Sequence, residues 1–181
     1  VYGIASGAVG YGEMLDRARK AKMMPRGPMP PVAKVFEQVS TATVSKSAAE
    51  AKELLFLRPE DGITMNRDRL LFDAKQKALA LVEGYTPPEA PVYQLPGASG
   101  RVALSMAAEG FRKQGKATDY DMVVSDALAT VLTGGDADVV DTVTEQDLLR
   151  IERETFMRLV REPRSIARVE AMMETGKPLR N

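Results

Sequence analysis

Apolar residues recur at three- and four-residue spacing along most of the chain, which is typical of amphipathic helices. One stripe follows the proline-rich stretch 25–31 and comprises Val32, Val35, Phe36 and Val39. A short basic helix, Glu13–Lys22, is expected before those prolines. No alternating apolar and polar run of useful length is present. The pattern therefore predicts six or seven helices and a mainly α fold.

Capping signals mark two helices in the first half of the chain. Ser47 and Glu50 have the spacing of a capping box, which predicts a helix that runs to about Leu55. Asn66 can cap a long helix over Arg67–Glu83, and Gly84 suits its C-terminal end. The buried face expected for this long helix is Leu71, Ala74, Ala78, Leu81 and Val82.

The second half of the chain predicts about four more helices, each with an apolar stripe. These stripes are Ala103, Met106, Ala107, Gly110 and Phe111; Val124, Ala127, Leu128, Val131 and Leu132; Leu148, Ile151, Thr155, Phe156, Leu159 and Val160; and Ile166, Val169 and Met173. The first two helices should pack together. The second should end at Gly134–Gly135, and Thr144 with Asp147 should open the third.

The best internal boundary is the stretch Tyr85–Pro91, which contains three prolines. Proline-rich stretches adopt extended conformations and act as spacers. The expected organisation is a first helical part at 1–84, a linker at 85–98 and a second helical part at 99–181.

Composition narrows the chemistry that this chain can perform. The 181 residues are 44% hydrophobic, and 25 basic residues balance 25 acidic ones, which is typical of a globular domain and gives no reason to expect nucleic-acid binding. The absence of His and Cys excludes His-based triads, Cys nucleophiles, disulfides and the usual zinc sites. No catalytic residue and no metal ligand is assigned.

No apolar run approaches the roughly 20 residues that cross a bilayer, so we expect no membrane span and a cytoplasmic protein. The sequence begins at Val1 and opens directly on a glycine-rich stretch. We therefore expect a fragment of a longer polypeptide.

The glycines Gly7, Gly10 and Gly12 do not follow the G-x-G-x-x-G order of a dinucleotide-binding turn. No strand–turn–helix unit with a distal acidic residue surrounds them. The favoured interpretation is a loop that leads into a helix. The alternative is a loop whose amides bind a phosphate or a thioester.

Two groups of acidic residues are interpreted as loop and turn chemistry. Asp136, Asp138 and Asp141 lack the turn glycine and the distal Glu of a helix–loop–helix calcium site. Glu60 and Asp61 are adjacent, so their side chains point in different directions and do not form an acid–base pair.

Basic residues form two clusters, each interpreted chiefly as a solvated helix face. They are Arg17, Arg19, Lys20, Lys22 and Arg26, and then Arg161, Arg164, Arg168, Lys177 and Arg180. The first cluster is the better candidate for contacts to the acidic tail of a cofactor.

Several separated motifs occur in the order found in a known enzyme family. They are Ile63–Lys77, Glu83–Pro88, Val131–Gly135 followed by Val143–Asp147, and Met173–Asn181. Together they resemble the C-terminal end of bacterial multifunctional fatty-acid β-oxidation enzymes, of the 3-hydroxyacyl-CoA dehydrogenase type whose crotonase-like (enoyl-CoA hydratase/isomerase) domain comes last. The resemblance covers nearly the whole chain from about Val32.

This resemblance implies the helical C-terminal end of a crotonase-like domain at 1–84, followed by a helical tail of about four helices. The family's NAD site, and the two glutamates and two amides of its hydratase reaction, lie upstream of Val1. NAD and acyl-CoA are thus implied for the parent enzyme, and no bound cofactor is implied within this chain. Arg17, Lys20 and Lys22 become candidate contacts to coenzyme A phosphates.

The expected function is that of an inactive fragment that contributes walls of the acyl-CoA pocket and domain or subunit interfaces. Its expected partners are the upstream domains of the same polypeptide, the acyl-CoA substrate and other copies of the same protein. The alternative is a non-catalytic helical module that binds a partner protein. A basic cluster that faces a pocket favours the first hypothesis.

Overall fold

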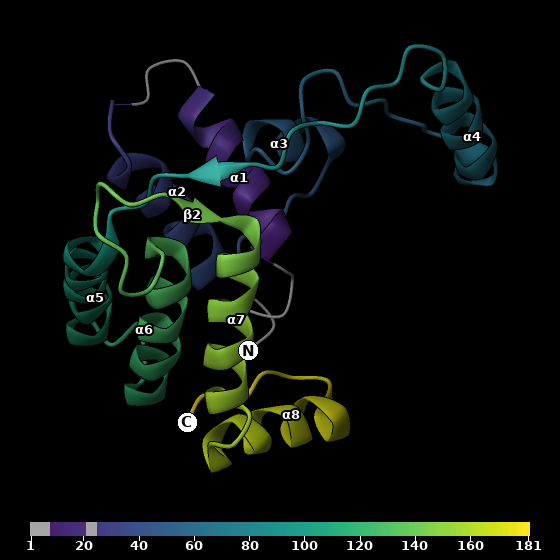
Figure 1. Cartoon of the computed structure of the whole chain (residues 1–181). Coiled ribbons are helices and arrows are strands. Elements are labelled where there is room, and N and C mark those ends of the chain that lie inside the picture. Colours follow the sequence, from purple (N-terminus) through teal and green to yellow (C-terminus); the bar gives the residue numbers. More distant parts are fainter. Residues whose placement is uncertain (1–7, 21–24) are drawn as a thin grey trace. The chain divides into compact units, whose positions relative to one another are not determined.

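The computed structural model describes residues 8–20 and 25–181, and these are mainly helical, as the periodicity predicts. The elements are α1 (Ala8–Lys20), α2 (Met29–Ser40), α3 (Ala48–Glu53), the 3-10 turn η1 (Arg67–Arg69), α4 (Leu70–Ala80), β1 (Val92–Tyr93), α5 (Gly97–Lys113), α6 (Asp119–Thr133), β2 (Val143–Thr144), α7 (Glu145–Leu159) and α8 (Pro163–Thr175) (Figure 1).

The chain divides into two compact units. The main unit combines the described residues up to Thr43 with Pro91–Asn181, and the inserted unit is Val44–Ala90. This division differs from the three parts expected around the proline-rich linker, because α1 and α2 pack with the second half of the chain. The three expected parts were defined by the domain order of the resembled enzymes. The packing within this chain does not test that order, so the three parts stay a prediction.

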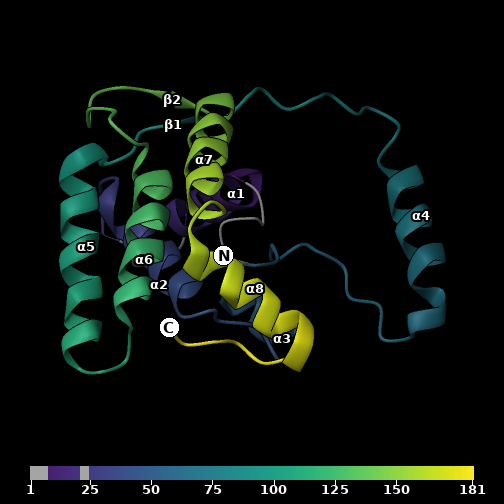
Figure 2. The ribbon, with the colours of Figure 1, turned by 90° about the horizontal axis from the view of Figure 1, so that it is seen from below.

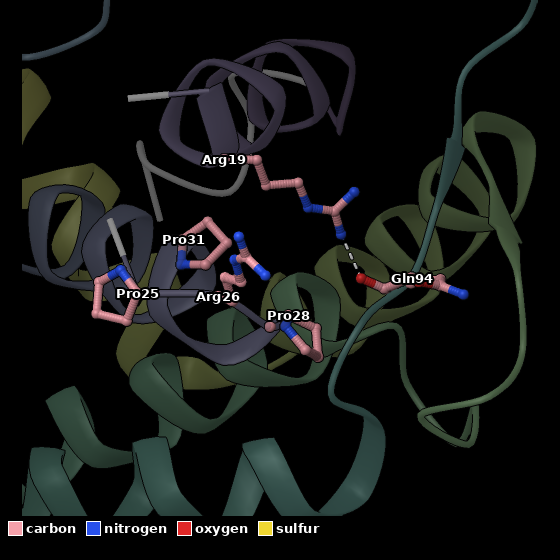
Figure 3. A pocket seen from close by; sticks show the side chains of 7 residues that line it. Arg19, Pro25, Arg26, Pro28, Pro31 and Gln94 are labelled. Carbon is pink, nitrogen blue, oxygen red and sulfur yellow. Dashed lines mark hydrogen bonds between the residues drawn. The ribbon is translucent and has the colours of Figure 1, made fainter. Parts of the chain in front are cut away.

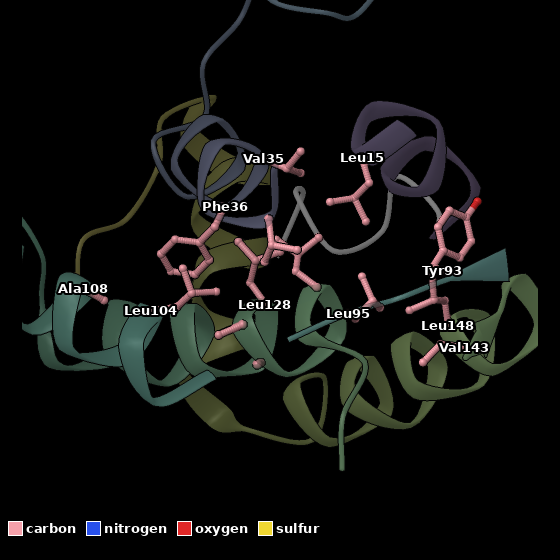
Figure 4. Packing of buried hydrophobic residues seen from close by; sticks show 14 of the residues in the cluster. Leu15, Val35, Phe36, Tyr93, Leu95, Leu104, Ala108, Leu128, Val143 and Leu148 are labelled. Carbon is pink, nitrogen blue, oxygen red and sulfur yellow. The ribbon is translucent and has the colours of Figure 1, made fainter. Parts of the chain in front are cut away.

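One apolar core holds the main unit together. Its large and almost fully enclosed members are Leu15, Val32, Val35, Phe36, Tyr93, Leu95, Leu104, Leu128, Leu132, Leu148 and Leu159 (Figure 4). They come from α1, α2, the β1 region, α5, α6 and α7. Burying a side chain of this size stabilises the fold by about 1.5–3 kcal/mol relative to leaving it exposed. The core therefore holds α1 and α2 together with α5, α6 and α7, although residues 44–90 separate the two groups in sequence.

The predicted stripes of α2, α6 and α7 are confirmed in their main residues. Val32, Val35 and Phe36 are buried on α2. On α6 the buried residues include Ala127, Leu128, Val131 and Leu132, and on α7 they include Leu148, Thr155 and Leu159. Helix α6 packs against α5, as expected, and ends at Gly134, which has a left-handed backbone conformation.

The predicted stripe of α5 is wrong. Met106 and Phe111 are exposed, with 72% of the Met106 residue accessible to solvent. The buried positions are instead Leu104 and Ala108, together with Gly97 and Gly100 at the start of the helix. Apolar residues lie on more than one side of α5, so periodicity alone selected the wrong side.

The predicted stripe of α8 is also wrong, since Ile166, Val169 and Met173 are exposed. This helix is attached through polar contacts. The buried Ser165 lies 2.5 Å from the Tyr120 hydroxyl, oxygen to oxygen, and the Arg168 guanidinium donates to Asp121 at 2.8 Å. The run of α8 beside the C-terminal end of α7 can be followed in Figure 2.

Strands β1 and β2 form a two-residue antiparallel pair that the sequence pattern did not predict. Val92 lies opposite Thr144, and Tyr93 lies opposite Val143. Tyr93 and Val143 are both buried. The pair fixes Gln94, the next residue, beside α1.

The inserted unit contains α3, η1 and α4 and buries little of its apolar surface. Ala51 is its one buried residue. The buried face expected on Arg67–Glu83 is wrong, because α4 has no buried residue and Leu71 is 82% exposed. The cap at Asn66 is confirmed, since its side-chain oxygen accepts from the Asp68 amide at 2.9 Å.

Two further boundaries differ from the sequence prediction. The Ser47 hydroxyl accepts from the Glu50 amide, as in a capping box, but the Glu50 carboxylate accepts from the Lys46 amide and α3 ends at Glu53. The expected glycine loop is helical at Gly10 and Gly12, which lie within α1, while Gly7 is outside the described residues.

None of the helices within 8–20 and 25–181 combines the length and the hydrophobicity that crossing a membrane requires. The cytoplasmic location stays a prediction.

Candidate functional site

A cavity of about 360 Å³ lies in the main unit between α1, the segment before α2, and the residue that follows β1. Its lining residues are Arg19, Pro25, Arg26, Gly27, Pro28, Pro31 and Gln94 (Figure 3). Three prolines fix the backbone φ angle along one wall, which makes that wall stiff. The volume is at the small end of the range found for small-molecule sites.

Arg19 reaches this cavity from the last turn of α1. Its guanidinium donates a hydrogen bond to the backbone carbonyl oxygen of Gln94 (Figure 3). A guanidinium carries five N–H donors, so this one bond leaves others available. The β1–β2 pair therefore positions Arg19 indirectly, because it holds the carbonyl group to which Arg19 is bonded.

Arg26 lies in the loop before α2 and is exposed. Its side chain lies between Pro28 and Pro31 in Figure 3. It makes no hydrogen bond or ion pair with the residues of 8–20 and 25–181. The described lining residues of the cavity include these two arginines and no carboxylate.

Two of the candidates predicted from the sequence, Arg17 and Lys20, do not line this cavity. Arg17 is half-buried on α1 and does not line the cavity. The exposed Lys20 ammonium pairs with Asp16 at 2.7 Å. Lys22 lies outside the described residues. The contacts of all three candidates to coenzyme A stay a prediction, and among the described residues of this basic cluster Arg19 and Arg26 line the cavity.

The second basic cluster is partly structural, so its interpretation as a solvated face is wrong for Arg168. The Arg168 side chain is 17% exposed and binds both Asp121 and the side chain of Asn181. Arg164 and Arg168 lie over Tyr120, with guanidinium carbons 4.5 and 4.8 Å from the ring centre. Cations near an aromatic face are attracted to it. Through these contacts the two arginines hold α8 against α6, and Arg168 also binds Asn181.

A larger cavity, of about 660 Å³, lies beside the loop after α6 and along α7. Its described lining contains three arginines, at 101, 150 and 158, and four acidic residues, at 136, 141, 147 and 154. Arg101 donates to Asp126 at 2.6 and 3.0 Å, and this hydrogen bonding holds the pKa of the Asp126 carboxyl below its ordinary value, against the effect of burial. Because Arg101 is paired with a carboxylate outside the described lining, the acidic residues of the lining outnumber the remaining arginines, and the cavity does not favour an anion.

The acidic residues of loops act as expected from the sequence. Asp141 accepts from the Asp138 amide at 2.8 Å, and Asp138 accepts from the Val140 amide. Asp61 accepts from the Arg58 amide at 2.8 Å within a turn. Each carboxylate thus stabilises local backbone.

Apolar side chains are exposed along α4 and in the segments that precede and follow it in sequence. They are Met65, Leu70, Leu71, Phe72, Leu79, Leu81, Val82 and Tyr85. We call this set the α4 apolar surface. Several large exposed apolar side chains on one short segment are typical of interaction sites on folded proteins.

The sequence is similar to that of a curated bacterial protein. Over 155 residues, or 85% of the chain, the sequence is 41% identical to a protein of Bacillus subtilis (strain 168) described as a probable 3-hydroxyacyl-CoA dehydrogenase. The matched segment is 20% of that relative, so the chain spans about a fifth of the relative's length. No protein-family model and no solved structure matches the chain.

The similarity supports the expected relation to one part of a 3-hydroxyacyl-CoA dehydrogenase. The crotonase-like domain, the cofactors and the partners expected from the resemblance are not tested by it and stay predictions.

Proposed function

We propose that this chain acts as one part of a longer 3-hydroxyacyl-CoA dehydrogenase of fatty-acid β-oxidation. In this role its helices supply domain or subunit interfaces and a wall of the acyl-CoA site, and the chain is inactive alone. The observation that carries the proposal is the 41% identity over 85% of the chain, confined to 20% of the relative.

The residue content supports dependence on other parts of such an enzyme. The chain has no His and no Cys, and its glycines do not form a dinucleotide-binding turn. Hydride transfer to NAD requires a bound nicotinamide and a positioned proton acceptor. Both come, in this proposal, from other parts of the longer polypeptide.

The α4 apolar surface supports an interface role. Most helical stability in proteins comes from packing of an apolar face, and α4 buries none of its residues within its own unit. In α4, Leu71 and Phe72 are 82% and 55% exposed. In this proposal the remainder of the crotonase-like domain, or another part of the same enzyme, covers this surface.

The test uses the full polypeptide that contains this chain. Purified, it should reduce NAD when given a 3-hydroxyacyl-CoA, and the isolated 181 residues should not. The double variant Leu71→Ser/Phe72→Ser of the full polypeptide should lose most of this activity or dissociate. The matched control Lys75→Ser/Lys77→Ser changes two other exposed side chains of α4 and should leave the activity unchanged.

Each part of the proposal fails separately. A full polypeptide without dehydrogenase activity would overturn the enzymatic role and favour a helical module that binds a partner protein. Unchanged activity and assembly in the Leu71→Ser/Phe72→Ser variant would overturn the interface role only.

A further inference from the structure

The cavity lined by Arg19 and Arg26 has the charge and the donors of an anion site. We infer that it binds a phosphate monoester group, either as free phosphate or as the terminal phosphate of a larger ligand such as coenzyme A. The phosphate site rests on the cavity itself, and only the coenzyme A arm rests on the proposed function.

The first argument is electrostatic. Two guanidinium groups line one small cavity, and its described lining includes no Asp or Glu. Like charges that share a site repel each other, and the repulsion is relieved when an anion enters. The 660 Å³ cavity differs in this respect, because its described lining contains four acidic residues beside three arginines.

The second argument is geometric. Arg19 projects from α1, whereas Arg26 projects from the loop before α2, so the two guanidinium groups approach from different elements (Figure 3). The Gln94 carbonyl orients Arg19, and the prolines at 25 and 28 restrain the loop that carries Arg26. Preorganised donors bind an anion with less loss of entropy than flexible ones.

The third argument concerns the class of anion. A phosphate monoester is close to doubly charged at neutral pH and offers three acceptor oxygens in different directions. It can therefore neutralise both guanidinium groups and accept from each of them. A carboxylate has one charge and two oxygens in a plane, so it matches a single arginine better.

Calorimetric titration of the 181-residue chain with inorganic phosphate, coenzyme A and dephospho-coenzyme A tests this inference. Dephospho-coenzyme A lacks only the 3′-phosphate monoester. We expect phosphate to bind, binding to weaken as salt rises, and Arg26→Gln to reduce affinity about tenfold or more. The matched control Arg153→Gln removes an exposed arginine of α7 that does not line the cavity, and it should leave affinity unchanged.

Because Arg26 is exposed, its replacement should leave the fold intact, which circular dichroism can verify. Coenzyme A that binds more tightly than dephospho-coenzyme A, with the difference lost in Arg26→Gln, assigns the site to the cofactor's 3′-phosphate. Phosphate binding with no coenzyme A binding assigns it to free phosphate and leaves the dehydrogenase proposal to its own assay. Three outcomes would overturn the inference. They are no binding of phosphate, coenzyme A or dephospho-coenzyme A, equal binding of coenzyme A and dephospho-coenzyme A, and equal effects of Arg26→Gln and Arg153→Gln.

Discussion

Gly97 occupies a position that no other residue can fill without moving the backbone. Its φ of +59° lies in the left-handed region, and a Cβ atom added there would lie 2.0 Å from the carbonyl oxygen of Ala137. Gly110, in the same helix, has open space around it. The same substitution should therefore have opposite consequences at these two sites.

Gly97→Ala should destabilise the chain by about 3 kcal/mol or more, since it combines a strained φ with a backbone clash. Gly110→Ala should instead stabilise α5 by about 0.5–1 kcal/mol, because Ala loses less conformational entropy in a helix. Urea unfolding of both variants measures the difference. Equal stabilities would contradict the close approach of Gly97 to Ala137.

Individual site residues were only partly predictable from the sequence. The basic cluster was visible, but Lys20 is neutralised by Asp16 while Arg19 and Arg26 line a cavity. That choice depends on the position of Gln94, which lies 75 residues from Arg19 and is fixed by the β1–β2 pair. A contact of such sequence separation leaves no periodic signal in the chain.

At the scale of elements, side-chain caps were the most reliable local signal. Thr144 and Asp147 were expected to open a helix, and in the structure each binds the other's amide, at 3.2 and 3.1 Å. The equivalent pair at the start of α6, Thr118 and Asp121, was not predicted although it has the same spacing. Capping is predictable because donor and acceptor lie three residues apart.

Thr144→Ala should lower the free energy of unfolding by about 1 kcal/mol, since an amide at the start of α7 loses its acceptor. Thr144→Ser retains the hydroxyl and should stay within about 0.5 kcal/mol of the parent chain. Thermal or urea unfolding can resolve the two. If the serine variant loses as much as the alanine variant, the threonine methyl group rather than the cap is the stabilising feature.

The buried sides of helices were harder to predict than the helices themselves. Both α4 and α5 have apolar residues on several sides, so periodicity offers more than one stripe. In α5 the partner helix α6 selects Leu104 and Ala108. In α4 no residue is buried, because its unit supplies no second layer. Burial is decided by the neighbours, which a local pattern does not contain.

In the molecule as a whole, helices that are distant in sequence pack together. Residues of α1 and α2 share a core with α6 and α7, although the inserted unit separates them in sequence. Within the inserted unit Ala51 alone is buried, so its backbone can open locally at little cost. Proteases cleave such segments first.

Trypsin should therefore cut first within Val44–Ala90, at the exposed residues Arg67, Arg69, Lys75 and Lys77. A cut at any of these sites gives an N-terminal and a C-terminal product. The two products should still elute together in native gel filtration and separate only in denaturant, because both contribute to the core of the main unit. Phe36→Ala removes a core side chain that is 5% exposed, should cost about 3–5 kcal/mol, and should let the nicked products separate.

Phe72→Ala, at a side chain of α4 that is 55% exposed, is the matched control and should leave the nicked products together. Fragment masses identify the cut sites, and elution volume reports the association. Two outcomes would contradict a main unit built from the segments before and after Val44–Ala90. One is a first cut within α6 or α7, and the other is separation of the nicked products of the parent chain without denaturant. Cutting that slows when the rest of the longer polypeptide is present would show that the inserted unit is covered there, as the proposed interface of α4 requires.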